Sequence, residues 1–265
     1  MSRLAVITGA SSGIGEAAAR RLAAEPDLEL VLVARREQRL RALAEQLPRA
    51  TWVAADLTAP DAPAQVREHV EGLGTPLNVL VNNAGASWRA TFAEGGYENV
   101  RRTMAINFDA VLRLTEALLP LLRAAAPSAI VNVSSTAARV ARARTGAYSA
   151  SKFALAGWSD SLYLEERPHG VHVGLVLPGF IATEGFPQRE LREKRLTRWA
   201  VSTPEHGAEA IAAAALDGVA ERYVPRPYAL AAAARVVLPA LVRRVMAGGG
   251  AASLTTSTGA DAAEG

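Results

Sequence analysis

The sequence predicts an α/β fold, a doubly wound parallel sheet with helices on both faces, and two features lead to this prediction. Short apolar runs alternate along the chain with segments in which apolar residues recur at helical spacing. The apolar runs show little polar alternation, which is typical of strands that helices bury on both faces. One domain can hold the whole pattern, because 265 residues are within the size of single α/β domains.

The expected elements follow one another as strand and helix in turn. We expect strands at residues 4–8, 30–34, 51–55, 77–82, 129–134 and 172–177. We expect helices at residues 14–24, 36–47 and 63–71, a long pair within 97–126, and another at 147–166. Residues 203–216 are predicted as a further helix and residues 222–224 as a short strand. This alternation is the pattern of βαβ units in a parallel sheet.

The C-terminal part of the chain is expected to add a helix and a tail. Residues 228–246 are rich in alanine and valine, but arginines and Pro239 interrupt a run that barely reaches the roughly 20 apolar residues of a membrane span. We expect instead an amphipathic helix that packs on the domain, on a partner subunit or at a membrane surface. Residues 247–265 are small, polar and without periodicity, which predicts a disordered tail after one domain at 1–246.

Composition narrows the possible chemistry. The chain has no cysteine, and its four scattered histidines lack metal-ligand spacing, so we expect no metal site and no thiol catalysis. The net charge of +3 comes with arginines interleaved with glutamates, so nucleic-acid binding is not expected. An apolar run already begins at Leu4, which leaves no room for a signal peptide, and we expect a cytoplasmic protein.

A glycine-rich turn follows the first expected strand. Residues 8–15 read TGASSGIG, with the glycines in a GxxxGxG spacing rather than GxGxxG. Such glycines allow a tight turn and a close approach of the backbone to a pyrophosphate, and the helix N-terminus that follows favours anions. Because a strand precedes it and a helix follows it, we prefer a nucleotide-binding loop to an ordinary turn. The expected contacts are Gly9, Ser11, Ser12, Gly13, Ile14 and Gly15.

The end of the second expected strand bears on the choice of cofactor. An acidic residue there would bind the ribose 2′-hydroxyl of NAD, but this strand ends in Ala34 and is followed by Arg35 and Arg36. Arginine pairs with a 2′-phosphate, so NADP(H) is expected and NAD(H) is less favoured. The alternative is that both arginines solvate the start of the next helix, although two cations there oppose the helix dipole.

The stretch from Ser134 to Lys152 carries groups suited to proton transfer. Tyr148 and Lys152 are four residues apart, so on a helix they project from the same face. A lysine cation stabilises a phenolate and moves a tyrosine toward proton transfer near neutral pH. Ser135 ends an apolar run and can hold a carbonyl or alcohol oxygen in front of that tyrosine. Alone, however, such a Tyr and Lys pair also occurs by chance on amphipathic helices.

Together and in this order, the motifs resemble those of the classical short-chain dehydrogenases/reductases, over about residues 4–216. The motifs that carry the resemblance are TGASSGIG at 8–15, Asp56-Leu57, NNAG at 82–85, Asn107, Ser135, YSASK at 148–152, and Pro178-Gly179 leading to Thr183. The resemblance implies a single Rossmann-type sheet, a nicotinamide cofactor, and interconversion of a carbonyl and a secondary alcohol by hydride transfer.

The resemblance also implies roles for individual residues. Tyr148 would donate a proton to the carbonyl oxygen, which Ser135 rather than Ser134 would orient. Lys152 would lower the pKa of the tyrosine and hold the nicotinamide ribose, and Asn107 would hold a water that links Lys152 to solvent. Without the resemblance, Asn107 is equally a polar residue at a helix kink. The further implied cofactor contacts are Arg35, Arg36, Asp56, Leu57, Asn83, Ala84, Gly85, Tyr148, Lys152, Pro178, Gly179, Ile181 and Thr183.

Two segments bear on the substrate. The loop before Tyr148 holds Arg139, Arg142 and Arg144, where the family often has small or apolar residues. These arginines suit an acidic substrate, a phosphate or a coenzyme A thioester, but a solvated loop is the preferred interpretation. Residues 184–200 are expected to form a substrate lid. The candidate pocket aromatics are Trp88, Phe180, Phe186 and Trp199.

We therefore predict an NADP(H)-dependent oxidoreductase that acts on a small-molecule carbonyl or alcohol, as a homodimer or homotetramer as the family implies. Two alternatives stay open. One is a cofactor-binding regulatory protein without catalysis, against which the matched proton-transfer residues argue. The other is a membrane-surface reductase of lipid-like ketones that docks through residues 228–246.

Overall fold

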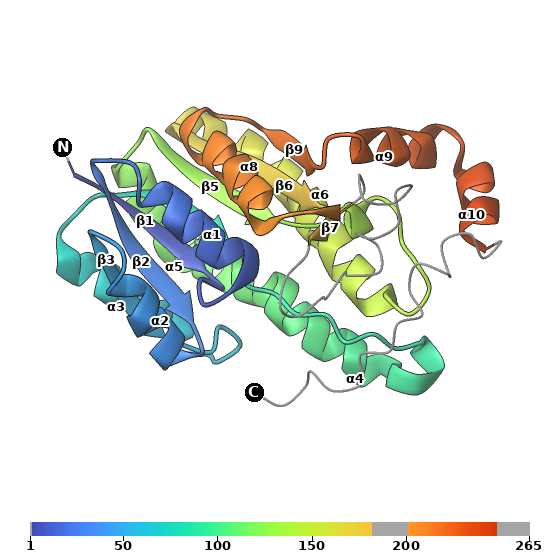
Figure 1. Cartoon of the computed structure of the whole chain (residues 1–265), viewed down its shortest axis with the longest axis horizontal. Coiled ribbons are helices and arrows are strands. Elements are labelled where there is room, and N and C mark those ends of the chain that lie inside the picture. The colour runs from blue at the N-terminus through green and yellow to red at the C-terminus, as the bar shows by residue number, and fades with distance from the viewer. Residues whose placement is uncertain (1, 182–200, 248–265) are drawn as a thin grey trace.

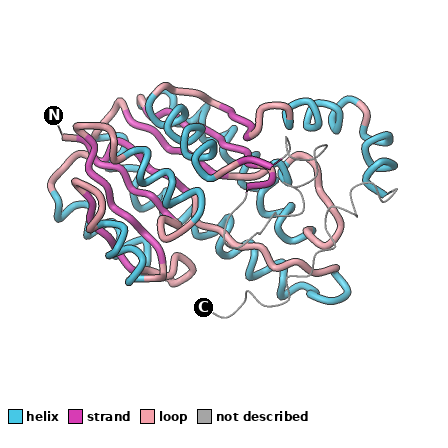
Figure 2. Tube along the Cα trace, in the orientation of Figure 1, coloured by secondary structure: helices cyan, strands magenta, loops and turns pink. Residues whose placement is uncertain are grey.

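Seven parallel strands form one sheet with helices on both faces, so the predicted fold class is confirmed (Figure 1; Figure 2). The computed structural model describes residues 2–181 and 201–247 of the chain. The strand order is β3-β2-β1-β4-β5-β6-β9, so the sheet extends outward in both directions from β1 and β4. Open sheets of this kind bind their ligands at the carboxyl ends of the strands where the order reverses.

The elements of this sheet occur where the sequence predicts them, with shifts of a few residues at their ends. The strands are β1 (Arg3–Thr8), β2 (Leu28–Ala34), β3 (Ala50–Ala54), β4 (Leu77–Asn82), β5 (Ser128–Val133), β6 (Val171–Pro178) and β9 (Glu221–Val224). The helices are α1 (Gly13–Leu22), α2 (Glu37–Ala44), α3 (Ala62–Leu73), α4 (Phe92–Met104), α5 (Ala110–Ala124), α6 (Gly146–Glu166) and α8 (Pro204–Leu216). A small unpredicted sheet pairs β7 (Phe180–Ile181) with β8 (Val201–Ser202).

The core lies on both faces of the sheet because successive strand side chains point to opposite sides. In β1, Ala5 and Ile7 belong to the cluster that contains α1, α2 and α8, whereas Leu4 and Val6 belong to the cluster that contains α3, α5 and α6. All four side chains are fully buried. A strand that is covered on both sides needs apolar residues at every position, which explains the continuous apolar runs in the sequence.

Three glycines build the turn between β1 and α1. Gly9 and Gly13 have positive φ values of 67° and 58°, which favour glycine. A β-carbon on Gly15 would lie 2.2 Å from the carbonyl oxygen of Gly9. Asn83 supports the turn from the end of β4, because its Nδ2 donates to the Thr8 carbonyl at 2.9 Å. The GxxxGxG spacing therefore follows from backbone geometry that leaves no room for side chains.

The C-terminal segment corrects the prediction of one helix at 228–246. It forms two helices, α9 (Tyr228–Val237) and α10 (Pro239–Ala247), which extend away from the sheet (Figure 1). Pro239 is the physical reason, because proline disfavours a helical conformation at the residue before it, and Leu238 has φ −126° and ψ 57°. Within the described residues, no helix is long and apolar enough to cross a membrane. The predicted lid at 184–200 and residues 248–265 of the predicted tail lie outside the described residues.

Replacing Gly15 with Ala should lower the free energy of unfolding by roughly 1–3 kcal/mol, because the new methyl group meets the Gly9 carbonyl and the backbone must shift. Gly72→Ala in α3 is the matched control. Nothing lies within 4 Å of a β-carbon at that position, and alanine in a helix stabilises by about 0.5–1 kcal/mol relative to glycine. Urea unfolding at pH 7 measures both values. An unchanged free energy for the Gly15 variant would contradict the crowding.

Candidate active site

Tyr148 and Lys152 project from the same face of α6, as their spacing predicts. The Lys152 Nζ atom lies 5.8 Å from the centroid of the Tyr148 ring. It donates a hydrogen bond of 2.9 Å to the carbonyl oxygen of Val133, the last residue of β5. Lys152 is only 4% exposed, and burial lowers its pKa to about 8, because a buried ammonium loses its hydration. This lysine can therefore exchange a proton at mildly alkaline pH.

The pKa of Tyr148 shifts against the expectation from the sequence. Burial raises the pKa of this phenol, while a side-chain hydrogen bond with Ser135 and the positive charge of Arg142 act to lower it. The Lys152 ammonium is not among the groups that lower it; it donates to the Val133 carbonyl instead. The net direction of this pKa shift is therefore opposite to the expected one. In this geometry Ser135 and Arg142 are the groups that favour the phenolate.

The two adjacent serines at the end of β5 have different partners. Ser135 is buried, and its hydroxyl donates to the Pro178 carbonyl at 3.2 Å. The Ser134 hydroxyl instead donates to the backbone carbonyl of Lys152 at 3.0 Å. Their opposite directions follow from the alternation of side chains in extended backbone. Of the two serines, Ser135 is therefore the one that reaches Tyr148.

Asn107 lies in a π turn, η1 (Ala105–Asp109), between α4 and α5. Such turns frequently occur at functional sites. The fully buried Asn107 side chain accepts from the N–H of Ala86 at 2.8 Å, donates to the Ala86 carbonyl at 2.9 Å and donates to Ser151 Oγ at 3.0 Å. It thus fastens the loop after β4 to α6. Ser151 is a residue of this site that sequence reasoning missed, although it lies within the YSASK motif.

Arg36 is held beside the glycine loop. Its guanidinium donates to Ser11 Oγ at 3.0 Å and to Ser12 Oγ at 2.7 Å. Two hydroxyls and an arginine at the N-terminus of α1 form a group of donors that suits phosphate oxygens. Arg35 is more exposed, and its charge acts on Asp56. The two predicted arginines therefore occupy different positions, and Arg36 is the one that contacts the loop.

Asp56 and Leu57 follow β3, and Asp56 closes a turn. Its Oδ1 accepts from the N–H of Thr58 at 2.9 Å and from the Thr58 hydroxyl at 2.7 Å. Desolvation opposes the charge, but these hydrogen bonds and Arg35 keep the pKa of Asp56 below its ordinary value. Leu57 is buried. Only Oδ1 takes part in the turn, so Oδ2 can still contact a cofactor. Asp56 can therefore serve both as a turn residue and as a cofactor contact.

The ends of β1 and β4 are joined through Thr8, which was not among the predicted contacts. Its hydroxyl accepts from the backbone N–H groups of Asn83 and Ala84 at 2.9 and 3.0 Å. A β-carbon on Gly85 would lie 3.6 Å from Lys152 Nζ. The NNAG segment therefore lies between the glycine loop and Lys152 of α6.

The carboxyl end of β6 packs against Tyr228 at the start of α9. A β-carbon on Gly179 would lie 2.5 Å from the Tyr228 ring. The ring can therefore occupy this place only because residue 179 has no side chain. No local pattern indicated this tyrosine, because it lies in a separate part of the chain. Pro178 ends β6, and Ile181 is buried in β7. The remaining predicted contact here, Thr183, lies outside the described residues.

Two of the four candidate pocket aromatics lie within the described residues. Trp88 packs against Arg102 of α4, whose guanidinium carbon is 4.5 Å from the ring centroid. Phe180 lies under Arg142, again with 4.5 Å between guanidinium carbon and ring centroid. The other two lie outside the described part of the chain: Phe186 and Trp199.

The three arginines before α6 differ in their surroundings, and Arg144 is exposed to solvent as expected. Arg139 pairs with Glu221 of β9 at 2.9 Å, and Arg144 pairs with Glu94 of α4 at 2.9 Å. Arg142 lies between them and is partly buried against an aromatic ring. The acidic partners are far away in the sequence, so the loop alone could not indicate them.

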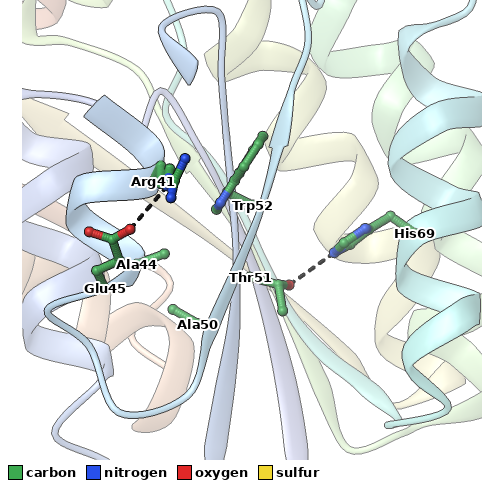
Figure 3. A pocket seen from close by; sticks show the side chains of 7 residues that line it. All are labelled: Arg41, Ala44, Glu45, Ala50, Thr51, Trp52 and His69. Carbon is green, nitrogen blue, oxygen red and sulfur yellow. Dashed lines mark hydrogen bonds and ion pairs between the residues drawn. The ribbon is translucent and has the colours of Figure 1, made fainter. Parts of the chain in front are cut away.

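A hollow of about 530 Å³ lies beside β3, away from these residues (Figure 3). It is lined by Arg41, Ala44, Glu45, Ala50, Thr51, Trp52 and His69. Its polar groups bind one another, because Arg41 pairs with Glu45 at 3.0 Å and Thr51 contacts His69 at 2.9 Å. β3 is an edge strand, separated from β5 by three other strands. The hollow is therefore not part of the site around Tyr148.

The comparisons with known proteins agree with this geometry. A family model for short chain dehydrogenases matches residues 3–194. The cis-4-hydroxycyclohexanecarboxylate dehydrogenase of Sinomonas cyclohexanicum is 34% identical, over 81% of this chain and 90% of its own length.

Two solved structures share the fold over most of the chain. The complex of RhlG from Pseudomonas aeruginosa with NADP has a TM-score of 0.74 and 26% identity, over 83% of this chain and 93% of that one. A short-chain dehydrogenase from Streptomyces avermitilis has a TM-score of 0.77 and 28% identity, over 97% of this chain and 99% of that one. The chain therefore belongs to the short-chain dehydrogenase family.

Proposed function

We propose that the protein is an NADP(H)-dependent oxidoreductase that interconverts a carbonyl and a secondary alcohol. The observation that carries the proposal is the convergence of Ser135, Tyr148 and Lys152 at the ends of β5 and β6. The glycine loop lies at the carboxyl end of β1, next to the reversal of strand order, where sheets of this kind bind dinucleotides. The NADP complex of a relative supports the same choice of cofactor class.

The side chains suit a proton transfer that accompanies reduction. When bound, the nicotinamide supplies or accepts the hydride at the carbonyl carbon. The raised pKa of Tyr148 keeps its hydroxyl protonated, as donation to the substrate oxygen requires. Ser135 orients that oxygen with its hydroxyl. Lys152, with a pKa of about 8, would hold the nicotinamide ribose and return a proton to the tyrosine, and Asn107 would position the water that resupplies it.

Arg35 and Arg36 support NADP(H) over NAD(H). Arg36 donates to both loop serines, and Arg35 lies where its charge acts on Asp56. A 2′-phosphate between them would form charge-assisted hydrogen bonds with either guanidinium. The strand end also lacks the acidic side chain that would bind a 2′-hydroxyl, since Ala34 occupies that position.

The relative from Sinomonas indicates a first substrate to test. Its name specifies a cyclic secondary alcohol that carries a carboxylate, so 4-oxocyclohexanecarboxylate is a suitable ketone for the reductive direction.

We also propose a homodimer or homotetramer. Exposed apolar side chains on the helices that flank the site support such an assembly: Tyr97 on α4, and Phe153 and Leu164 on α6.

A second candidate property is peripheral binding to an anionic membrane through α9 and α10. Residues 225–247 contain four arginines and no acidic residue, which complements an anionic lipid surface. The apolar side chains of the segment are at least half exposed at Leu230, Val236, Val237, Leu238, Leu241 and Val245. Apolar side chains that alternate with arginines on a helix suit the boundary between headgroups and acyl chains.

Tyr148→Phe should lower turnover by roughly 10²–10⁴-fold, because the proton donor is lost, while NADPH affinity stays nearly unchanged. Tyr163→Phe, at a tyrosine in edge contact with His172, is the control and should keep full activity. NADPH absorbance measures turnover, and calorimetry measures affinity. Substantial residual turnover in the Tyr148 variant would refute the proton-donor role. NADPH binding by the unmodified protein, without turnover on a broad ketone and alcohol panel, would favour the regulatory alternative.

Arg35→Ala and Arg36→Ala should each weaken NADPH binding by roughly 10- to 100-fold and change NADH binding little, because hydrogen bonds to a charged group are lost. Arg41→Ala, which breaks only an exposed pair with Glu45 on α2, is the control. Dissociation constants for both cofactors measure the effect. Equal losses of NADPH and NADH affinity would rule out the 2′-phosphate contact.

The full chain should sediment with vesicles of phosphatidylcholine and phosphatidylglycerol and not with phosphatidylcholine alone. The double variants Val236→Ser/Val237→Ser and Arg243→Gln/Arg244→Gln should each lose this binding. Leu164→Ser, an exposed apolar residue on α6, should keep it. The protein could instead bind neither vesicle and self-associate. If both double variants abolish that self-association, α9 and α10 contact a second copy of the chain rather than a membrane.

A further inference from the structure

We propose that Arg142 binds an anionic group of the substrate, a carboxylate or a phosphate, and so selects anionic ketones and alcohols. This rests on the oxidoreductase function proposed above and specifies its substrate class. The inference depends on three observations: the loop around Arg142 is anchored on both sides, its guanidinium has no acidic partner among the described residues, and it lies beside the reacting tyrosine.

The loop that carries Arg142 is anchored by its neighbours. On one side Arg139 pairs with Glu221, and on the other Arg144 pairs with Glu94. The Arg142 carbonyl itself accepts from the Thr145 hydroxyl at 2.9 Å. The flanking arginines point to acids on the surrounding elements, while the guanidinium of Arg142 stacks on the ring of Phe180 in β7. The backbone therefore presents Arg142 inward without needing a ligand to order it.

Arg142 is a partly buried cation, and within residues 2–181 and 201–247 it forms no ion pair with a carboxylate. Its guanidinium carbon lies over the face of the Phe180 ring, 4.5 Å from the centroid. Burial lowers the pKa of Arg142, and the nearby charge of Arg89 acts in the same direction. A cation-π contact offsets only part of the loss of hydration of a buried cation. A bound oxyanion would supply the missing charge and hydrogen bonds.

The position of Arg142 favours the substrate over the cofactor phosphates. Its guanidinium stacks on Phe180, two residues after Pro178, whose carbonyl accepts from the Ser135 hydroxyl. Arg142 therefore lies on the Ser135 side of the site, and its charge acts on Tyr148 and Tyr228. The phosphate loop lies at the end of β1, which β4 separates from β5, a distance of about 10 Å at the usual strand spacing. An anion on Arg142 would therefore belong to the molecule that is reduced or oxidised.

The test compares each anionic ketone with a matched neutral one. The full-length protein is assayed with NADPH on 4-oxocyclohexanecarboxylate and its methyl ester, and on dihydroxyacetone phosphate and dihydroxyacetone. We expect kcat/KM for the acid, the phosphate or both to exceed that of the neutral partner by roughly 10- to 100-fold. Arg142→Gln should abolish this ratio, mainly by raising KM for the anionic ketone, and comparing the anionic and neutral ketones within the same variant cancels any change in the pKa of Tyr148. Arg142→Lys should restore part of the ratio.

The outcomes separate this inference from the proposed function. If neutral ketones are reduced and the ratio is near one, or if Arg142→Gln leaves a high ratio unchanged, the inference is overturned and the oxidoreductase function stands. If no ketone or alcohol in the wider panel is converted with either cofactor, the proposed function fails, and the inference fails with it. Preference for the acid identifies the ligand group as a carboxylate, and preference for the phosphate identifies it as a phosphate. Far-ultraviolet circular dichroism confirms that both Arg142 variants are folded.

Discussion

The joint between β5 and α6 is the constraint on which the site depends. Lys152 donates from Nζ to the Val133 carbonyl, and Ser134 donates to the Lys152 backbone carbonyl. One bond is donated by a side chain of α6 to β5, and the other is donated to the backbone of α6 from the segment after β5. Together they fix the position and the rotation of α6 relative to the end of β5. Tyr148 lies one helical turn before Lys152, and Ser135 directly follows Ser134. The phenol and the hydroxyl are therefore brought together by a buried joint and not by surface contacts.

A layer of amides and hydroxyls inside the core supports this joint. Asn82 of β4 donates to Asn132 of β5 at 2.9 Å and to Thr115 of α5 at 3.1 Å. Asn132 in turn donates to Ser159 of α6 at 2.9 Å. All four residues are buried, and buried polar groups with partners favour one arrangement of their elements over others. The layer therefore aligns both helices beside the site with the central strands.

Some features could be predicted from the sequence because their causes are local. Continuous apolar runs predict strands covered on both sides, the glycine spacing follows from crowding within eight residues, and a four-residue spacing places Tyr148 and Lys152 on one face. Other features could not be predicted because they depend on distant partners. Tyr228 reaches Gly179 from another element, and the acids that pair with Arg139 and Arg144 lie 82 and 50 residues away in the chain. No pattern within a loop reports such contacts.

The electrostatics of Arg142 and Tyr148 join substrate recognition to proton transfer. Arg142 acts to lower the pKa of Tyr148, which favours the phenolate, the form that removes a proton from an alcohol. An anion bound to Arg142 would neutralise much of that charge and raise the pKa of Tyr148, since an opposite charge cancels the field of the cation. The tyrosine would then hold its proton when an anionic ketone is in place. Binding of an anion at Arg142 would thus couple recognition of the substrate to the protonation state of Tyr148.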